Sequence, residues 1–193
     1  MEDNIKFYYE YANAGYKVVM APASHSYFDH PADASPNEPG FYWACRFNDV
    51  LKTFSFRPMQ FYANADYKRY GAPYQPGEVC EEITRCPKLE KPENIIGLEG
   101  CLWSETMRNP EMLIGQIFPR LIALADRAFY ERSFDMSDKT GTVILRDEGF
   151  RTEWESFKVT AREVLRELRS KLTDFPARLP VVGIQPVDEV NNS

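Results

Sequence analysis

The chain has 193 residues, and its 23 Lys and Arg against 29 Asp and Glu give a formal net charge of −6 at pH 7. Hydrophobic residues at 44% and charged residues at 27% are typical of a globular protein and argue against a disordered or low-complexity chain. The negative charge argues against nucleic acid as the main partner, because phosphate binding needs a clustered Lys and Arg surface. No run approaches the ~18 apolar residues of a membrane helix, so we expect no membrane span.

The first elements predict an α/β protein of one domain or a little more. Residues 1 to 4 are acidic and lack the positive start of a signal peptide, so we expect the chain to begin as though inside a larger protein. Residues 4 to 14 place aromatic side chains on neighbouring helical turns before Gly15, a usual helix stop. Residues 17 to 21 are a short apolar run, which predicts a buried strand of the kind found in parallel sheets.

Two long loops are predicted to interrupt the first half of the chain. Residues 24 to 40 are dense in Pro, Asp, Ser and Asn, and a loop of this length greatly exceeds the usual ~4–6 residues, so we expect it to be functional. A helix is predicted over residues 41 to 53. Residues 58 to 92 look irregular again and resemble a surface insertion.

The cysteines leave two interpretations open. Cys80 and Cys86 enclose five residues within the second loop, so a small local disulfide is plausible in an oxidising compartment. A zinc site would want Cys-x2-4-Cys spacing with a matching second pair, and neither His25 nor His30 completes one, so we expect no metal. The other two cysteines are Cys45 and Cys101.

The second half of the chain predicts another strand, loop and helix unit. Residues 94 to 100 form the second buried-strand candidate. Asn109 and Pro110 are a well-formed helix start, with a kink expected at Pro119. Residues 152 to 172 carry apolar side chains at three- and four-residue steps, which predicts an amphipathic helix with Trp154 in the core. We therefore expect one domain over residues 1–175 and an extended linker or tail over 176–193.

Polar and aromatic residues follow both predicted strands, where α/β folds concentrate their binding groups. Tyr27, Asp29 and Trp43 follow the first strand, and Trp103 and Glu105 follow the second. Indoles stack on the apolar face of a sugar ring and carboxylates accept hydrogen bonds from its hydroxyls. A plainer interpretation has Tyr27 and Asp29 satisfying loop backbone groups, Trp103 in the core and Glu105 paired with a surface arginine. The sequence contains no Gly-x-Ser-x-Gly elbow and no glycine-rich phosphate loop.

Ordered motifs resemble the C-terminal part of glycoside hydrolase family 20, closest to the bacterial-type chitobiases. The motifs are Tyr27-Phe-Asp29, Gly40-Phe-Tyr-Trp43-Ala-Cys-Arg46, Gly100-Cys-Leu-Trp103-Ser-Glu105 and Phe118-Pro-Arg-Leu-Ile-Ala-Leu-Ala-Asp126. The resemblance implies an α/β fold, in which this chain supplies the last two strand and helix units of a (β/α)8 TIM barrel plus a C-terminal amphipathic helix and tail. It implies hydrolysis of terminal β-linked N-acetylhexosamine by substrate-assisted retaining catalysis, with no cofactor.

The resemblance also implies a role for each site residue. Tyr27 should position the acetamido oxygen of the substrate. Asp29 and Glu105 should accept hydrogen bonds from the outer hydroxyls of the same sugar. Trp103 should form one wall of the −1 subsite, and Trp43 should stack on the +1 sugar. Family members are periplasmic, secreted or lysosomal, and a Cys80–Cys86 disulfide would fit those compartments.

One departure from the family pattern is large, because the catalytic His-x-Gly-Gly-Asp-Glu motif is absent from all 193 residues. We therefore expect the chain to be a fragment of a β-N-acetylhexosaminidase that is inactive by itself and needs the missing N-terminal barrel portion. Its ligand would be an oligosaccharide or glycoconjugate containing N-acetylhexosamine. Two alternatives stay open: a non-catalytic GlcNAc- or chitin-binding module, and a half-barrel that works only with a partner chain.

Overall fold

The computed structural model describes residues 6–67, 72–74, 78–82, 86–139 and 141–172. These residues form two compact units, each assembled from three stretches of the chain. The first unit contains residues 6–20, 55–98 and 130–153, and the second contains residues 21–54, 99–129 and 154–172. Within the described ranges, no helix combines the length and apolar character needed to cross a membrane.

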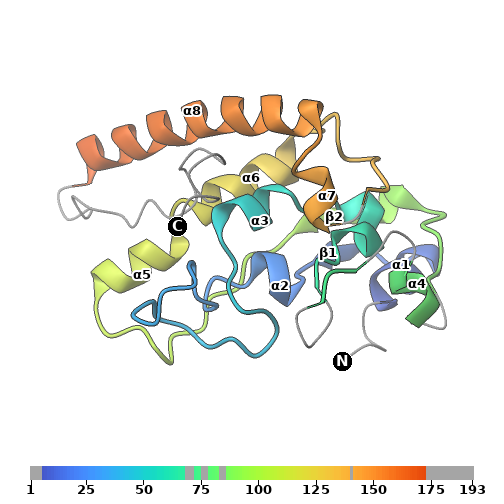
Figure 1. Ribbon diagram of the computed structural model, residues 1–193, viewed down its shortest axis with the longest axis horizontal. Helices are drawn as coiled ribbons and strands as arrows, with labels where there is room; N and C mark the ends of the chain where they lie inside the picture. Colours follow the sequence, from blue (N-terminus) through green and yellow to red (C-terminus); the bar gives the residue numbers. More distant parts are fainter. Residues whose placement is uncertain (1–5, 68–71, 75–77, 83–85, 140, 173–193) are drawn as a thin grey trace. The chain divides into compact units, whose positions relative to one another are not determined.

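A two-stranded parallel sheet lies in the first unit. Its strands β1 (Val18–Met20) and β2 (Ile95–Leu98) lie side by side (Figure 1), and α1 (Phe7–Asn13) precedes β1. The predicted helix and both strands are therefore confirmed, with slightly shorter bounds. The expectation of strands buried on both faces is wrong, because Val19 is 45% exposed and Ile96 is 58% exposed. One face of this sheet is open to solvent.

The other face of the sheet packs into the core of the first unit. Tyr9 on α1 links this core to the segment that follows residue 57, because its hydroxyl donates to the carbonyl of Pro58 (2.7 Å) and accepts from the backbone N–H of Phe61 (2.8 Å). Burial raises the pKa of Tyr9 to about 12. The buried members of this core are Ala12, Val18, Met20 and Phe56, and Tyr8, Phe61, Leu89, Ile95 and Leu98 pack against them.

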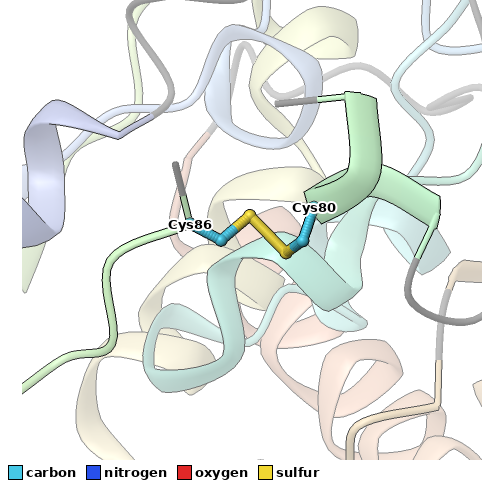
Figure 2. Close-up of a disulfide and its surroundings, with 2 residues drawn as sticks. All are labelled: Cys80 and Cys86. Carbon is cyan, nitrogen blue, oxygen red and sulfur yellow. A yellow bond between two sulfur atoms is a disulfide. The ribbon is translucent and has the colours of Figure 1, made fainter. Parts of the chain in front are cut away.

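The segment expected to be irregular, residues 58 to 92, contains short helices. They are the 3-10 helix η2 (Pro58–Asn64), α4 (Glu78–Glu82) and the start of η3 (Pro92–Asn94). Cys80, on α4, forms a disulfide with Cys86 (Figure 2), so this small loop is closed covalently. Among the described residues, no cluster of three His, Cys, Asp or Glu side chains could hold a metal ion.

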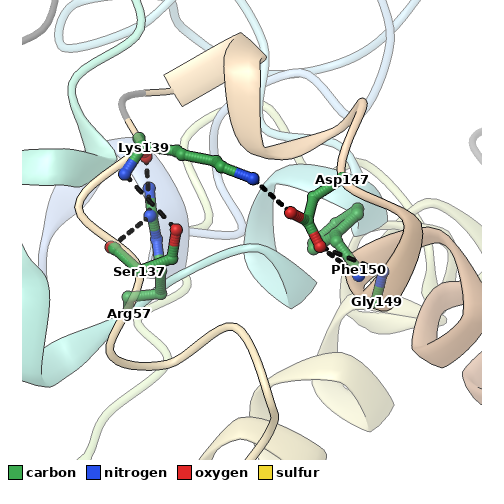
Figure 3. Close-up of polar contacts among 6 residues, drawn as sticks. All are labelled: Arg57, Ser137, Lys139, Asp147, Gly149 and Phe150. Carbon is green, nitrogen blue, oxygen red and sulfur yellow. Dashed lines mark hydrogen bonds and ion pairs between the residues drawn. The ribbon is translucent and has the colours of Figure 1, made fainter.

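A buried arginine ties together the C-terminal part of the first unit. Arg57 donates from Nη1 to the carbonyls of Ser137 (2.8 Å) and Lys139 (2.7 Å), and from Nη2 to the carbonyl of Ala63 (2.7 Å). These contacts are visible in part in Figure 3. A side chain thus satisfies backbone carbonyls in the segment after residue 130. Between this point and α8, the described residues contain the short helix α7 (Gly141–Ile144).

Asp147 begins the long helix α8 (Glu148–Lys171). Its Oδ1 accepts from the backbone N–H groups of Gly149 (3.0 Å) and Phe150 (3.3 Å), which satisfies donors that a helix start leaves unpaired. Lys139 pairs with the other carboxylate oxygen (Figure 3), and this contact lowers the pKa of Asp147. The predicted helix over 152–172 is thus confirmed, but it starts four residues earlier. Residues 173–193, which include the expected tail, lie outside the described residues.

The second unit is built from helices around an aromatic core. The ring of Phe54 lies 5.3 Å from that of Trp154 and 4.6 Å from that of Phe157, centroid to centroid. Trp154 is 1% exposed, so its predicted place in the core is confirmed. The helices of this unit are α2 (Ala23–Ser26), α3 (Val50–Phe54), α5 (Pro110–Ile117), α6 (Arg120–Phe129) and the part of α8 from Trp154 onward.

The first long loop differs from its prediction at both ends. Residues 24 to 26 belong to α2 rather than to a loop, and the helix expected over 41–53 begins only at Val50. Residues 41 to 49 are irregular because contacts with distant residues hold their backbone, as described below. The start at Asn109 is confirmed, since its Oδ1 accepts from the backbone N–H of Met112 at 2.8 Å. The expected kink is a full break between α5 and α6 at a cis Phe118–Pro119 bond.

Candidate functional site

The segments that follow β1 and β2 meet again at Tyr27. Tyr27 and Cys101 form a parallel bridge, in which the Cys101 N–H donates to the carbonyl of Ser26 (3.0 Å) and the Phe28 N–H donates to the carbonyl of Cys101 (2.7 Å). This pairing fixes the backbone of Tyr27 beside the segment that leads to Trp103. The segments that follow the two strands therefore lie side by side at this bridge.

Three rings form an aromatic group around Trp43. The Tyr27 and Trp43 rings are 5.7 Å apart at 74°, and the His30 and Trp43 rings are 4.9 Å apart at 78°. Both are edge-to-face arrangements, which aromatic rings prefer. Trp43 is nevertheless 53% exposed, so much of its indole is available to a ligand.

The sequence suggested His30 only as a zinc ligand without a matching pair, and the structure places its ring beside those of Tyr27 and Trp43. Its side chain is fully buried, and neither ring nitrogen has a hydrogen-bond partner among the described residues. Burial lowers the pKa of His30, against the opposing effect of Asp29, so the imidazole is neutral at neutral pH. The only sequence signal for this place was its position next to Asp29 in a loop already thought functional.

Asp29 is buried, and its Oδ1 has no hydrogen-bond partner in the described part of the chain. A buried carboxylate oxygen without a donor is costly, which makes it suited to accept a hydrogen bond from a ligand. Trp103 is 56% exposed, so the interpretation of Trp103 as a core residue is wrong. Trp103 makes no ring contact with another described residue, and Glu105 is also exposed.

A glycine closes the loop that carries these residues. Gly40 has a φ of +122°, and a Cβ at this position would collide with the backbone carbonyl oxygen of Asp29. The next residue, Phe41, donates its backbone N–H to that same oxygen at 3.2 Å. The close approach brings residues 41 to 43 against residues 29 to 31, and only glycine permits it.

Gln116, near the end of α5, and Arg120, at the start of α6, are further residues that the sequence did not mark as part of the site. Arg120 donates to the backbone carbonyls on both sides of Asp29, those of Phe28 (2.7 Å) and His30 (3.0 Å). Gln116 donates to Glu38 Oε1 at 3.0 Å, and burial raises the pKa of that carboxyl group. The motif Phe118-Pro-Arg was visible in the sequence, but nothing local indicated where the guanidinium would reach.

The site as a whole presents a phenol, an unpaired buried carboxylate oxygen and exposed indoles. This combination suits an uncharged, hydroxylated ring. The indoles can cover the apolar faces of the ring, and the carboxylate oxygen can accept a hydrogen bond from one of its hydroxyls. The structure brings together Tyr27, Asp29 and Trp43 through one loop. The predicted roles of all five residues, Trp103 and Glu105 included, remain predictions.

Comparisons with known proteins point in one direction. A family model described as "Glycosyl hydrolase family 20, catalytic domain" matches residues 3–132. The chain is 38% identical over 136 residues to a beta-hexosaminidase of Vibrio vulnificus, covering 69% of this chain and 15% of that protein. It is 30% identical over 190 residues to an N,N'-diacetylchitobiase of Vibrio harveyi, covering 93% of this chain and 20% of that protein. The chain thus spans a fifth or less of the length of these relatives.

The fold is similar to part of a solved relative. The structure of the GH20 beta-N-acetylhexosaminidase from Streptomyces coelicolor A3(2) matches with a TM-score of 0.52 at 20% identity, covering 92% of this chain and 26% of that one. At this identity the likeness concerns the fold alone. It supports the predicted class, a mixed helix and strand chain from a (β/α)8 barrel family, while the assignment to the last two units stays a prediction.

Proposed function

Because the chain belongs to glycoside hydrolase family 20, we propose that it supplies the closing part of the catalytic barrel of a β-N-acetylhexosaminidase. In this proposal it contributes part of the pocket for a terminal, non-reducing, β-linked N-acetylhexosamine. The observation that carries the proposal is the contact of the Tyr27 and Trp43 rings beside the buried Asp29, in the loop that follows β1. The phenol and the carboxylate can hydrogen-bond to a sugar, and the indole can stack on its ring.

The proposed reaction retains the anomeric configuration through assistance by the substrate. The 2-acetamido oxygen of the sugar attacks the anomeric carbon as the glycosidic bond breaks, and the departing oxygen receives a proton. The Tyr27 hydroxyl would donate a hydrogen bond to the acetamido oxygen and hold it in line for attack. Such positioning accelerates the reaction because the entropy cost of aligning the attacking oxygen with the anomeric carbon is paid before the bond forms.

The remaining residues would bind the rest of the ligand. Asp29 would accept a hydrogen bond from an outer hydroxyl through its unpaired Oδ1, and Glu105 would do the same from the second segment. Trp103 would form a wall of the −1 subsite, and Trp43 would stack on the +1 sugar. The exposure of both indoles supports these roles, since a stacking platform must be open to its ligand.

The proton donor is the part that this chain lacks, because the His-x-Gly-Gly-Asp-Glu motif is absent from its sequence. Loss of a general acid reduces a rate by about 10²- to 10⁴-fold from that role alone. We therefore propose that the 193-residue chain has no hydrolase activity by itself. Its partner would be the N-terminal portion of the same barrel, which would bring the general acid.

Activity tests use a chromogenic β-N-acetylglucosaminide. The purified chain should give no turnover, and a mixture with a separately produced N-terminal barrel portion of the Vibrio vulnificus relative should give turnover. Tyr27→Phe should then lower the turnover about 10²-fold, because the ring remains while the hydroxyl is lost. Turnover by the isolated chain that survives both Tyr27→Phe and Glu105→Gln would contradict the proposed mechanism.

A second function, a non-catalytic GlcNAc- or chitin-binding module, is favoured by one observation: Trp43 and Trp103 are both more than half exposed. Titration of the isolated chain with chitotriose, followed by tryptophan fluorescence, tests it. Saturable quenching that Trp43→Phe weakens would support a binding site in this chain. No detectable binding would exclude the module, and would leave the barrel-fragment proposal to the mixing experiment.

A further inference from the structure

Five consecutive backbone carbonyls in the candidate site, those of residues 27 to 31, are all held by hydrogen bonds from elsewhere in the second unit. The Asp29 carbonyl accepts from the backbone N–H of Phe41 (3.2 Å), and the Pro31 carbonyl accepts from the backbone N–H of Asn48 (2.7 Å). Side chains hold the other three. A segment without regular structure would otherwise leave these oxygens to solvent or unpaired. Here each one is fixed by a partner.

Arg120 supplies two of these bonds and spans the loop. Its Nη2 donates to the Phe28 carbonyl (2.7 Å), and its Nη1 donates to the carbonyls of His30 (3.0 Å) and Asn48 (2.9 Å). The remaining N–H groups bond to the carbonyl of Gln116, at 2.9 Å from Nε and 2.5 Å from Nη2. Nη2 also contacts the side-chain Oε1 of Gln116, so every nitrogen of the guanidinium has carbonyl oxygen partners.

Asn48 supplies the last bond of the series. Its Nδ2 donates to the Tyr27 carbonyl at 3.2 Å, while its own carbonyl accepts from Arg120. Its side chain is fully buried. Asn48 thus holds the two outer carbonyls of this segment, those of Tyr27 and Pro31, and Arg120 holds the two carbonyls on either side of Asp29.

The charge of Arg120 makes this arrangement demanding. Arg120 is 1% exposed, and burial lowers its pKa to about 10, against the opposing effects of Glu38, Asp49 and Asp29. It remains cationic at neutral pH, so carbonyl dipoles and these carboxylates must replace its hydration. Burying this cation costs free energy of desolvation. The guanidinium is planar and rigid and has five donors, so it is suited to hold several backbone segments at once.

We propose that Arg120 and Asn48 are positioning residues of the sugar site. They hold residues 27 to 31 so that Tyr27, Asp29 and Trp43 are placed for the ligand before it binds. This inference rests on the proposed function for its ligand, but the placement itself can be measured without one. The preorganisation reduces the ordering cost of binding, because the loop does not have to be fixed by the sugar.

Arg120→Lys is the first test, since the amine has the charge but not the five-donor fork. Arg57→Lys is the matched control, because Arg57 is equally buried and also donates to backbone carbonyls, in the first unit. The readout is the indole ¹H–¹⁵N signal of Trp43 in the full chain, assigned with Trp43→Phe. We expect Arg120→Lys to shift or broaden this signal and Arg57→Lys to leave it unchanged, although both lower the unfolding midpoint.

Asn48→Ala is the second variant, which keeps the test decisive if Arg120→Lys does not fold. It should also move the Trp43 signal. Chitotriose titration should then show binding weakened by roughly tenfold or more in both site variants and unchanged in Arg57→Lys. An unchanged Trp43 signal in a folded site variant, or an equal shift in the Arg57 control, would overturn the inference. Failure of the parent chain to bind chitotriose would exclude the binding module and leave the proposed function to the mixing experiment, while the indole signals would still decide the placement.

Discussion

At the scale of single residues, His30 makes the stability of the chain depend on pH. Its folded-state pKa is lowered by burial below the unfolded value of about 6.5. The unfolded chain therefore binds a proton more readily than the folded one as the pH falls. The contribution of a neutral His30 is fully present above about pH 6.5 and is lost progressively at lower pH.

The expected result is a urea midpoint that decreases between about pH 7.5 and about pH 5, by less in His30→Gln than in the parent chain. The difference between the two chains isolates His30, since Glu38, whose pKa is raised, is present in both. His25→Gln is the matched control, because His25 is the other histidine of the chain. This variant should keep the decrease in urea midpoint that is due to His30. Parallel pH profiles for the parent and His30→Gln would contradict the assignment.

The sequence predicts which site residues follow each strand, because this depends only on their order along the chain. Tyr27 and the segment of Trp103 each follow a strand, and parallel strands end at the same edge, so their approach was predictable. The places of His30 and Arg120 were not, because they depend on contacts between residues up to 92 positions apart in the chain. Periodicity and composition report on neighbours within a few residues, and they say little about which carbonyl a distant arginine reaches.

At the scale of elements, the cap of α5 can be tested directly. Asn109→Ala removes the oxygen that accepts from the Met112 N–H, and it should lower the free energy of unfolding by about 1 kcal/mol, within about 0.5–2. Asn109→Ser restores an acceptor at the same place and should recover most of this loss. Urea titration of the three chains measures it. Equal losses for alanine and serine would show that the side chain acts in some other way.

Helix α8 offers a second test with an internal control. Phe157 is buried against Phe54 and Trp154, whereas Val159, two residues later, is 53% exposed. Phe157→Ala should cost about 3–5 kcal/mol of unfolding free energy, because a large cavity is left in a packed core. Val159→Ala should stay within about 0.5 kcal/mol. The two unfolding curves, compared with the parent chain, check the burial of this helix face.

The stretch from residue 41 to 53 shows why one element was predicted incorrectly. Its apolar and aromatic residues resemble a helix in sequence, but Phe41 and Asn48 give their backbone N–H groups to carbonyls of the preceding loop. A helix over this stretch would need the Asn48 donor for its own hydrogen bonds. Helix α8, by contrast, was predicted well because its apolar stripe persists over many turns and is recognisable without knowledge of its partners.

At the scale of the whole molecule, the state of the four cysteines is a single measurable property. Cys80 and Cys86 form a disulfide, while Cys45 and Cys101 are partly buried and form no disulfide. Alkylation of the denatured chain before reduction should therefore label two cysteines, and alkylation after reduction should label all four. Peptide mass mapping identifies the sites. Labelling of Cys80 or Cys86 without reductant, in protein kept under oxidising conditions, would contradict the pairing.

The parallel pairing of β1 with β2 has a consequence for how the chain is made. Lys17, next to β1, bonds to Asn94, next to β2, across 77 positions of the sequence. At about 5–20 residues per second, a ribosome needs about 4–15 s to synthesise that interval, so β1 emerges well before its partner strand exists. During that time the edge of β1 that pairs with β2 lacks this partner. Chaperone capture of nascent chains should accordingly peak before β2 emerges and decline once it is free to pair.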